Sequence, residues 1–125
     1  MCRLLIVVIS YLSFFVLPAS AQNFLNQKSA IWTAKEFKFH TGEVMPNLNI
    51  GYTTLGNPNG EVIVILHGTA GSGQGMLNNT FGGELFGPGQ VLDATKYFII
   101  LPDSIGAGKS SKPSDGLRAK FPKYN

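Results

Sequence analysis

The 125-residue sequence is poor in the residues that build disulfides, metal sites and catalytic relays. It has one cysteine, Cys2, and two histidines, His40 and His67. A single cysteine excludes an intramolecular disulfide, so the folded chain depends on packing for its stability. The two histidines stand 27 positions apart (67 − 40), which matches no metal-ligand spacing. We therefore expect neither a bound metal nor a cofactor.

Charge of either sign is also scarce. Ten Lys and Arg residues stand against seven Asp and Glu residues, which gives a formal net charge of +3. The positive residues are scattered along the chain and form no cluster. This pattern argues against a nucleic-acid partner and against binding to an anionic membrane surface.

The longest apolar run lies at the amino terminus. Arg3 precedes an apolar stretch from Leu4 to Leu17, Pro18 breaks the helix, and residues 19–21 are the small residues Ala-Ser-Ala. The stretch is shorter than the roughly 20 residues that a bilayer-spanning helix needs. The pattern predicts a secretory signal peptide over residues 1–21, and hence a secreted or periplasmic protein with no stable membrane insertion after cleavage. The alternative is an uncleaved membrane anchor.

Two alternating segments follow a polar lead-in over residues 22–34. Apolar and polar residues alternate with a period of two from Lys35 to His40, and again from Leu48 to Leu55. A turn at residues 41–43 separates the two segments. They therefore predict an antiparallel hairpin at the edge of a sheet.

Two further segments are continuously apolar and rich in β-branched residues, Val62 to Leu66 and Tyr97 to Leu101. Strands buried on both faces of a parallel sheet have this composition. The stretch between them is long enough for the crossover that parallel neighbours need, although its many glycines disfavour helix. We expect an α/β fold that has an incomplete sheet, made of an antiparallel edge hairpin and two parallel strands.

The first apolar strand runs into His67-Gly68-Thr69-Ala70-Gly71. Acyl-transfer enzymes need backbone N–H groups in such a turn, because these donors stabilise the oxyanion of a tetrahedral intermediate. We expect the N–H of Thr69, and secondly that of Ala70, to serve as donors. The alternative is an ordinary turn at the end of a strand, in which His67 is a structural residue.

The second apolar strand runs into Asp103-Ser104-Ile105-Gly106-Ala107-Gly108-Lys109-Ser110. The end of this segment matches a phosphate-binding loop, G-x-x-x-x-G-K-[ST], but Asp103 stands where the first glycine belongs. Such a loop must also open a helix, and residues 111–116 resist helix formation. The other interpretation is a structural loop that shapes the mouth of a site and carries no proton chemistry.

From about residue 37 to residue 124 the sequence resembles the homoserine O-acetyltransferase-like branch of the α/β-hydrolase superfamily. The matching residues are Phe39-x-x-Gly42-Glu43-x-Met45-Pro46, Ile50-Gly51-Tyr52-x-x-x-Gly56, the strand into His67-Gly68, Gly87-Pro88-Gly89-x-x-Leu92-Asp93-x-x-Lys96-Tyr97-Phe98-Ile99-Ile100, Asp103-x-x-Gly106 and Phe121-Pro122. The resemblance implies a Ser-Asp-His triad that moves an acyl group, with a small ester or acyl substrate in the complete protein. It also implies that Thr69 and Ala70 form an oxyanion hole, and that His67, Gly68, Asp103 and Gly106 belong to loops at the site mouth.

No serine nucleophile is recognisable in these residues. The sequence contains no G-x-S-x-G, and no histidine follows Ser110, although the family order is Ser, Asp or Glu, and then His. We therefore expect residues 35–125 to be the amino-terminal part of an α/β-hydrolase domain, inactive alone, whose partner is a missing carboxyl-terminal half. Two alternatives stay open, a small self-contained secreted binding protein and a nucleotide-binding domain. The acyl group and its acceptor are not specified by the sequence.

Overall fold

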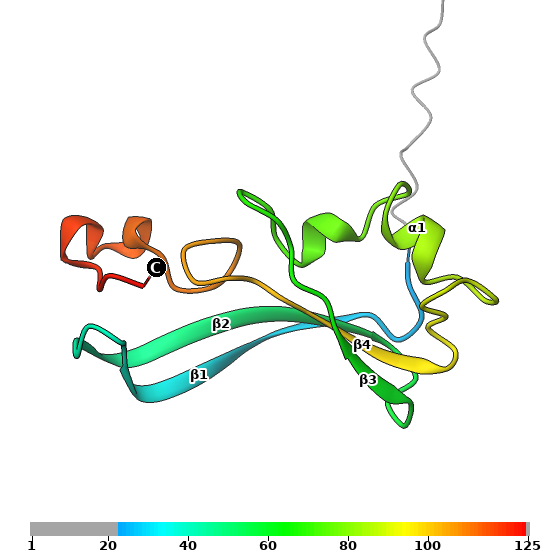
Figure 1. The fold of residues 1–125 in the computed structure, drawn as a ribbon, viewed down its shortest axis with the longest axis horizontal. Helices are drawn as coiled ribbons and strands as arrows, with labels where there is room; N and C mark the ends of the chain where they lie inside the picture. Colours follow the sequence, from blue (N-terminus) through cyan, green and yellow to red (C-terminus); the bar gives the residue numbers. More distant parts are fainter. Residues whose placement is uncertain (1–22, 125) are drawn as a thin grey trace, which may run out of the picture.

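The computed structural model describes residues 23–124, so the predicted signal peptide over residues 1–21 lies outside the described part of the chain. Four strands form one mixed sheet in the order β1-β2-β4-β3 (Figure 1). None of the helices between residues 23 and 124 combines the length and the apolar composition needed to cross a membrane. The predicted α/β fold with an incomplete sheet is confirmed.

Strands β1 (Lys28–Lys38) and β2 (Val44–Gly56) form the expected antiparallel edge hairpin, with Lys28 opposite Thr54 and Lys38 opposite Val44. The predicted start of the first strand at residue 35 is wrong, because residues 28–34 belong to β1. Ile31 and Trp32 are neighbours and both are exposed, so this segment shows no alternation. Its pairing rests on the backbone ladder and on cross-strand hydrogen bonds.

Strands β3 (Glu61–Val64) and β4 (Tyr97–Pro102) are parallel, as predicted, and β4 also pairs with β2 in the antiparallel sense. The expectation that the first of these strands is buried on both faces is wrong. Val62 and Val64 are 59% and 57% exposed. Val62 and Val64 lie opposite Phe98 and Ile100 of β4, so they point to the face of the sheet that the segment between β3 and β4 does not cover.

The larger of two buried clusters lies on one face of the sheet, where the segment between β3 and β4 covers it (Figure 1); the other, Ala34, Phe39 and Leu48, lies in the β1–β2 hairpin. That segment holds the 3₁₀ turn η1 (Gln74–Met76) and the single-turn helix α1 (Gly82–Leu85), so it is a crossover with little helix, as its glycines predict. The buried residues of the larger cluster are Leu55, Phe86, Ala94, Ile99 and Leu101.

Asp93 organises the turn that leads into β4. Its carboxylate accepts hydrogen bonds from the Thr95 hydroxyl at 2.6 Å, the Gly89 N–H at 2.7 Å and the Thr95 N–H at 2.8 Å. These bonds, with the Thr95 hydroxyl first, hold the pKa of Asp93 below its ordinary value. The turn thereby fixes where β4 begins.

The opposite face of the sheet is open. A groove of about 610 Å³ runs across β1, β2 and β4 on this face, and its lining is mostly apolar. The groove residues are Lys28, Ala30, Trp32, Ile50, Tyr52, Thr54, Phe98, Ile100 and Pro102. It holds none of the residues that the sequence predicts for a site.

The chain ends in a segment with two further 3₁₀ turns, η2 (Pro113–Asp115) and η3 (Arg118–Lys120), as the polar, proline-containing sequence predicts. Phe121 and Pro122 follow η3 and are buried. This segment brings the described end of the chain back beside the loop that follows β4.

Candidate functional site

The two sequence motifs meet at one edge of the sheet. Residues 67–71 follow β3, and residues 103–111 follow β4. Because β3 and β4 are parallel neighbours, both loops leave the sheet at its carboxyl edge, which is where open α/β sheets bind ligands. The loops face each other across a cleft of about 450 Å³, lined by His67, Gly68, Thr69, Ala70, Ser104, Ile105, Gly106, Ala107 and Tyr124.

His67 bridges the two loops through both ring nitrogens. Its Nε2 accepts a hydrogen bond from the Ser104 N–H at 3.0 Å, so the ring proton must sit on Nδ1. Nδ1 in turn donates to the Gly68 carbonyl at 2.7 Å. The arrangement gives His67 a positioning role, since neither nitrogen is left to exchange a proton with a substrate.

The turn at residues 68–71 presents two unused donors. The Gly71 N–H closes the turn on the Gly68 carbonyl at 3.1 Å. Within residues 23–124, the N–H groups of Thr69 and Ala70 donate no hydrogen bond to the chain. Ala70 has φ +59, a left-handed conformation that costs a non-glycine residue of order 1–3 kcal/mol and that is enriched at functional sites.

A smaller cleft of about 240 Å³ lies beside the same turn. It shares His67, Gly68 and Thr69 with the larger cleft and is otherwise lined by Gly71, Ser72, Gly75, Met76, Asn78 and Phe81. Thr69 thus belongs to both clefts.

Asp103 holds three segments together at the base of the site. Its carboxylate accepts the Gly73 N–H at 2.7 Å and the Lys109 N–H at 2.8 Å, and its own N–H donates to the Gly51 carbonyl at 2.8 Å. Gly108 has φ +51, and a Cβ there would overlap the Asp103 carboxylate. The glycine is therefore required by the close approach of this side chain.

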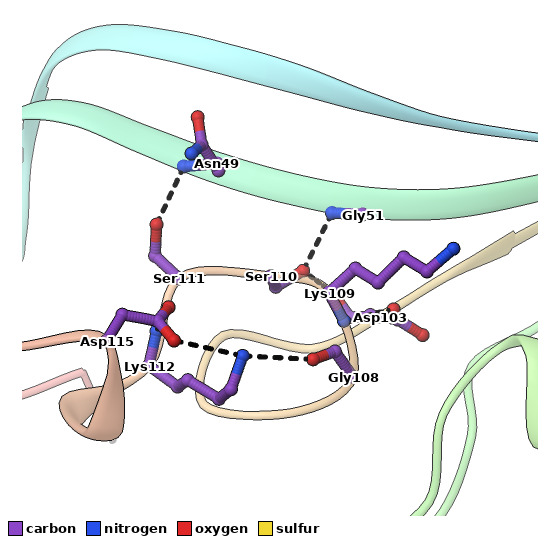
Figure 2. Close-up of polar contacts among 9 residues, drawn as sticks. All are labelled: Asn49, Gly51, Asp103, Gly108, Lys109, Ser110, Ser111, Lys112 and Asp115. Carbon is purple, nitrogen blue, oxygen red and sulfur yellow. Dashed lines mark hydrogen bonds and ion pairs between the residues drawn. The ribbon is translucent and has the colours of Figure 1, made fainter.

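Two serines fasten the loop after β4 to strand β2, as Figure 2 shows. The Ser110 hydroxyl donates to the Asp103 carbonyl at 2.7 Å and accepts the Gly51 N–H at 2.9 Å. The Ser111 hydroxyl accepts the Asn49 N–H at 2.9 Å, and the Ser111 N–H donates back to the Asn49 carbonyl at 2.9 Å. The loop thus extends the edge of β2 with side-chain and backbone bonds.

The geometry of residues 103–110 argues against a phosphate-binding loop. Ser110 is fully buried and its hydroxyl is already engaged, whereas a phosphate-binding loop needs that hydroxyl for Mg²⁺. The 3₁₀ turn η2 (Pro113–Asp115) follows in place of a helix. The structure favours the second interpretation of the motif, a structural loop at the site mouth.

Lys112 closes the outer side of this loop. Its Nζ lies 3.1 Å from the Asp115 carboxylate and donates to the Gly108 carbonyl at 3.1 Å (Figure 2). The hydrogen bond from Lys112 holds the pKa of Asp115 below its ordinary value. This lysine therefore supports the loop and does not point into the cleft.

The sequence predicts both loops but not these supporting roles. Beyond their own loop, Asp103 and Ser110 bond to β2 and to the loop after β3, at residues 30 to 59 positions away. Tyr124 was also missed, although it lines the larger cleft. The feature of the sequence that indicates such close contacts is the density of small residues between Asp103 and Ser110, which leaves room for neighbouring backbone to approach.

No protein-family model matches the chain. Its sequence is 31% identical over 94 residues to the homoserine O-acetyltransferase of Haloferax prahovense, an alignment that covers 65% of this chain and 23% of that protein. The homoserine O-acetyltransferase of Emericella nidulans is 29% identical over 93 residues, covering 72% of this chain and 19% of that protein.

Solved structures give the same result for the fold. The homoserine O-acetyltransferase of Staphylococcus aureus superposes with a TM-score of 0.65 at 23% identity, over 78% of this chain and 30% of that one. An acetylester hydrolase from Corynebacterium glutamicum gives a TM-score of 0.65 at 25% identity, over 78% of this chain and 29% of that one. The chain has the fold of an amino-terminal portion of an α/β-hydrolase.

Its sequence and fold are similar to those of homoserine O-acetyltransferases and esterases over this portion. It spans about a quarter of the length of the curated relatives it matches. The four-stranded sheet is the part of the α/β-hydrolase sheet that this portion supplies. The assignment of Thr69 and Ala70 as oxyanion donors stays a prediction.

Proposed function

We propose that this chain is the amino-terminal part of an exported serine hydrolase or acyltransferase, and that the turn after β3 binds the oxyanion of acyl transfer. The observation that carries the proposal is the pair of N–H groups on Thr69 and Ala70, which have no acceptor within residues 23–124; both residues line the larger cleft, and Thr69 also lines the smaller one. The similarity of the chain to acyltransferases and esterases supports this role.

The chemistry follows from the position of the donors. An attacking nucleophile converts a carbonyl carbon to a tetrahedral centre, and the negative charge on oxygen is stabilised by N–H groups 2.7–3.1 Å away. His67 and Asp103 hold the turn in place from opposite sides, through the Ser104 and Gly73 N–H groups. Loss of one oxyanion donor costs such an enzyme about 10²- to 10³-fold in rate.

The nucleophile is proposed to come from other polypeptide. The 125 residues contain no G-x-S-x-G, and both nitrogens of His67 are engaged. We therefore expect the purified chain to hydrolyse no short acyl ester above a heat-treated control. The substrate of the complete protein is proposed to be a small ester or acyl donor, and the partner is a carboxyl-terminal portion that continues the sheet beyond β3.

Binding of a tetrahedral anion tests the proposal without requiring turnover. We expect methylphosphonate, a mimic of the tetrahedral intermediate, to shift the amide signals of Thr69 and Ala70 saturably in a ¹H–¹⁵N NMR titration of the full chain. Sulfate provides a control for unspecific anion binding. Unchanged Thr69 and Ala70 signals at saturating methylphosphonate would refute the oxyanion role.

The open groove on the other face favours a second candidate, a self-contained binding protein. Its roughly 610 Å³ and mostly apolar lining suit an apolar ligand. The exposed edge of β3 counts against a self-contained unit, because unpaired apolar edges promote aggregation. A soluble monomer that unfolds in one cooperative thermal transition would favour this candidate, whereas concentration-dependent association favours the first.

A further inference from the structure

Tyr124 forms a wall of the larger cleft, opposite the turn after β3. It lines this cleft together with Thr69, Ala70 and residues 104–107. Its ring packs edge-on against Phe121, with the ring centroids 5.5 Å apart. The side chain is 42% exposed, so it is accessible from the cleft while its ring is supported from behind.

Gly106 provides the space in which the Tyr124 hydroxyl sits. The glycine has φ +89, and a Cβ on it would overlap the hydroxyl oxygen. The Gly106 N–H donates to the Ser111 carbonyl at 2.9 Å, which fixes this part of the loop. The hydroxyl therefore rests against backbone and has a defined place beside the cleft.

The backbone before Tyr124 is anchored from two directions. Phe121 and Pro122 are buried, and the Lys123 N–H donates to a Glu43 carboxylate oxygen at 3.2 Å in the turn between β1 and β2. The hydroxyl of Thr41, and secondly the Lys123 N–H, hold the pKa of Glu43 below its ordinary value. The carboxylate thus stays ionised and keeps the segment attached.

The Tyr124 hydroxyl makes no hydrogen bond to any residue between 23 and 124. It is a donor and acceptor at the wall of a cleft that also contains the two free N–H groups. The smaller cleft, by contrast, has the apolar side chains of Met76 and Phe81 in its lining. The two cavities that Thr69 lines therefore differ in chemistry.

We propose that Tyr124 is a substrate-binding residue whose hydroxyl hydrogen-bonds an oxygen atom of the alcohol part of the substrate. The inference rests on the proposed oxyanion role of Thr69 and Ala70. With the carbonyl oxygen at those donors, a short acyl group enters the smaller cleft beside Met76 and Phe81. The alcohol part enters the larger cleft and meets Tyr124. The class of substrate is an ester of a short acyl group with an oxygen-bearing alcohol.

Two phosphonate probes distinguish a hydrogen bond from the Tyr124 hydroxyl from mere packing of the Tyr124 ring. Both are monoesters of methylphosphonate, one with a 2-hydroxyethyl group and one with a propyl group, so only the distal oxygen differs. Their dissociation constants are measured on the full chain from the Thr69 and Ala70 amide shifts. We expect Tyr124→Phe to weaken the hydroxyethyl probe about fivefold, the value of one neutral hydrogen bond, and to leave the propyl probe unchanged.

Tyr52→Phe is the matched control, because Tyr52 lies in the open groove away from the cleft. It is expected to change neither dissociation constant. Equal weakening of both probes by Tyr124→Phe would reduce Tyr124 to a packing residue, and no weakening of either probe would remove it from the site. If neither probe shifts Thr69 and Ala70 in the unmodified chain, the oxyanion role fails and this inference fails with it.

Discussion

The buried hydroxyl of Ser110 carries the strongest single prediction for stability. It is fully buried, donates to the Asp103 carbonyl and accepts the Gly51 N–H. Ser110→Ala leaves both backbone groups without their partner. Each buried polar group left unsatisfied costs about 1–3 kcal/mol, so we expect the free energy of unfolding to fall by about 2–6 kcal/mol.

The assay is urea unfolding followed by circular dichroism, with thermal unfolding beside it. For a domain of this size a loss of 2 kcal/mol lowers the Tm by at least about 8 °C. Ser114→Ala is the matched control, because Ser114 is exposed and makes no side-chain hydrogen bond to the described residues. If Ser110→Ala changed stability no more than Ser114→Ala, the fastening role of this serine would be refuted.

Four further predictions address the loops, the turn before β4 and the sheet edge. Gly108→Ala should lower the free energy of unfolding by more than about 2 kcal/mol in urea titrations, because φ is +51 and the new Cβ overlaps Asp103; a neutral result would contradict the described loop. Ala70→Gly should raise the free energy of unfolding by about 0.5–1 kcal/mol, because glycine relieves the left-handed backbone strain at a smaller cost in conformational entropy. A lower free energy of unfolding would show that Ala70 is unstrained. Because the pKa of Asp93 is lowered in the folded chain, its carboxylate stabilises the fold at pH values above the ordinary carboxylate range, and this stabilisation is lost as the pH falls through the lowered pKa. The free energy of unfolding of Asp93→Asn should therefore fall less steeply with decreasing pH than that of the unmodified chain. Parallel curves for the two proteins would contradict this role of Asp93. Val64→Lys places a charge on the exposed edge strand β3, so it should reduce the self-association of the chain, measured by light scattering at high concentration. Equal scattering by the variant and the unmodified chain would show that the chains do not associate through β3.

The strands that carry a clear pattern were predictable. Tyr97–Leu101 is a continuous run of apolar residues and forms β4, which like β2 has a strand neighbour on each side. The first half of β1 was missed because Ile31 and Trp32 are adjacent and both exposed, so no alternation marks the strand. Hydrogen bonds such as that between the Ser29 and Thr53 hydroxyls at 2.9 Å hold it, and a pairing 24 positions apart leaves no local pattern.

The candidate site was predictable as a location and less so as a geometry. The His67-Gly68 turn and the Asp103 loop were both placed at strand ends by sequence. That His67 bridges to the Ser104 N–H, 37 positions away, depends on the parallel register of β3 and β4. The approach of Tyr124 to Gly106 likewise depends on how the chain returns after η3. Such long-range contacts decide which donors remain free.

The central claim is that the turn after β3 holds an oxyanion, and a crystal structure of the full chain soaked with methylphosphonate tests it most directly. The account predicts a phosphonate oxygen 2.7–3.1 Å from the backbone nitrogens of both Thr69 and Ala70. Phosphonate bound elsewhere on the chain, or those two N–H groups found donating to carbonyl oxygens of the chain itself, would contradict it.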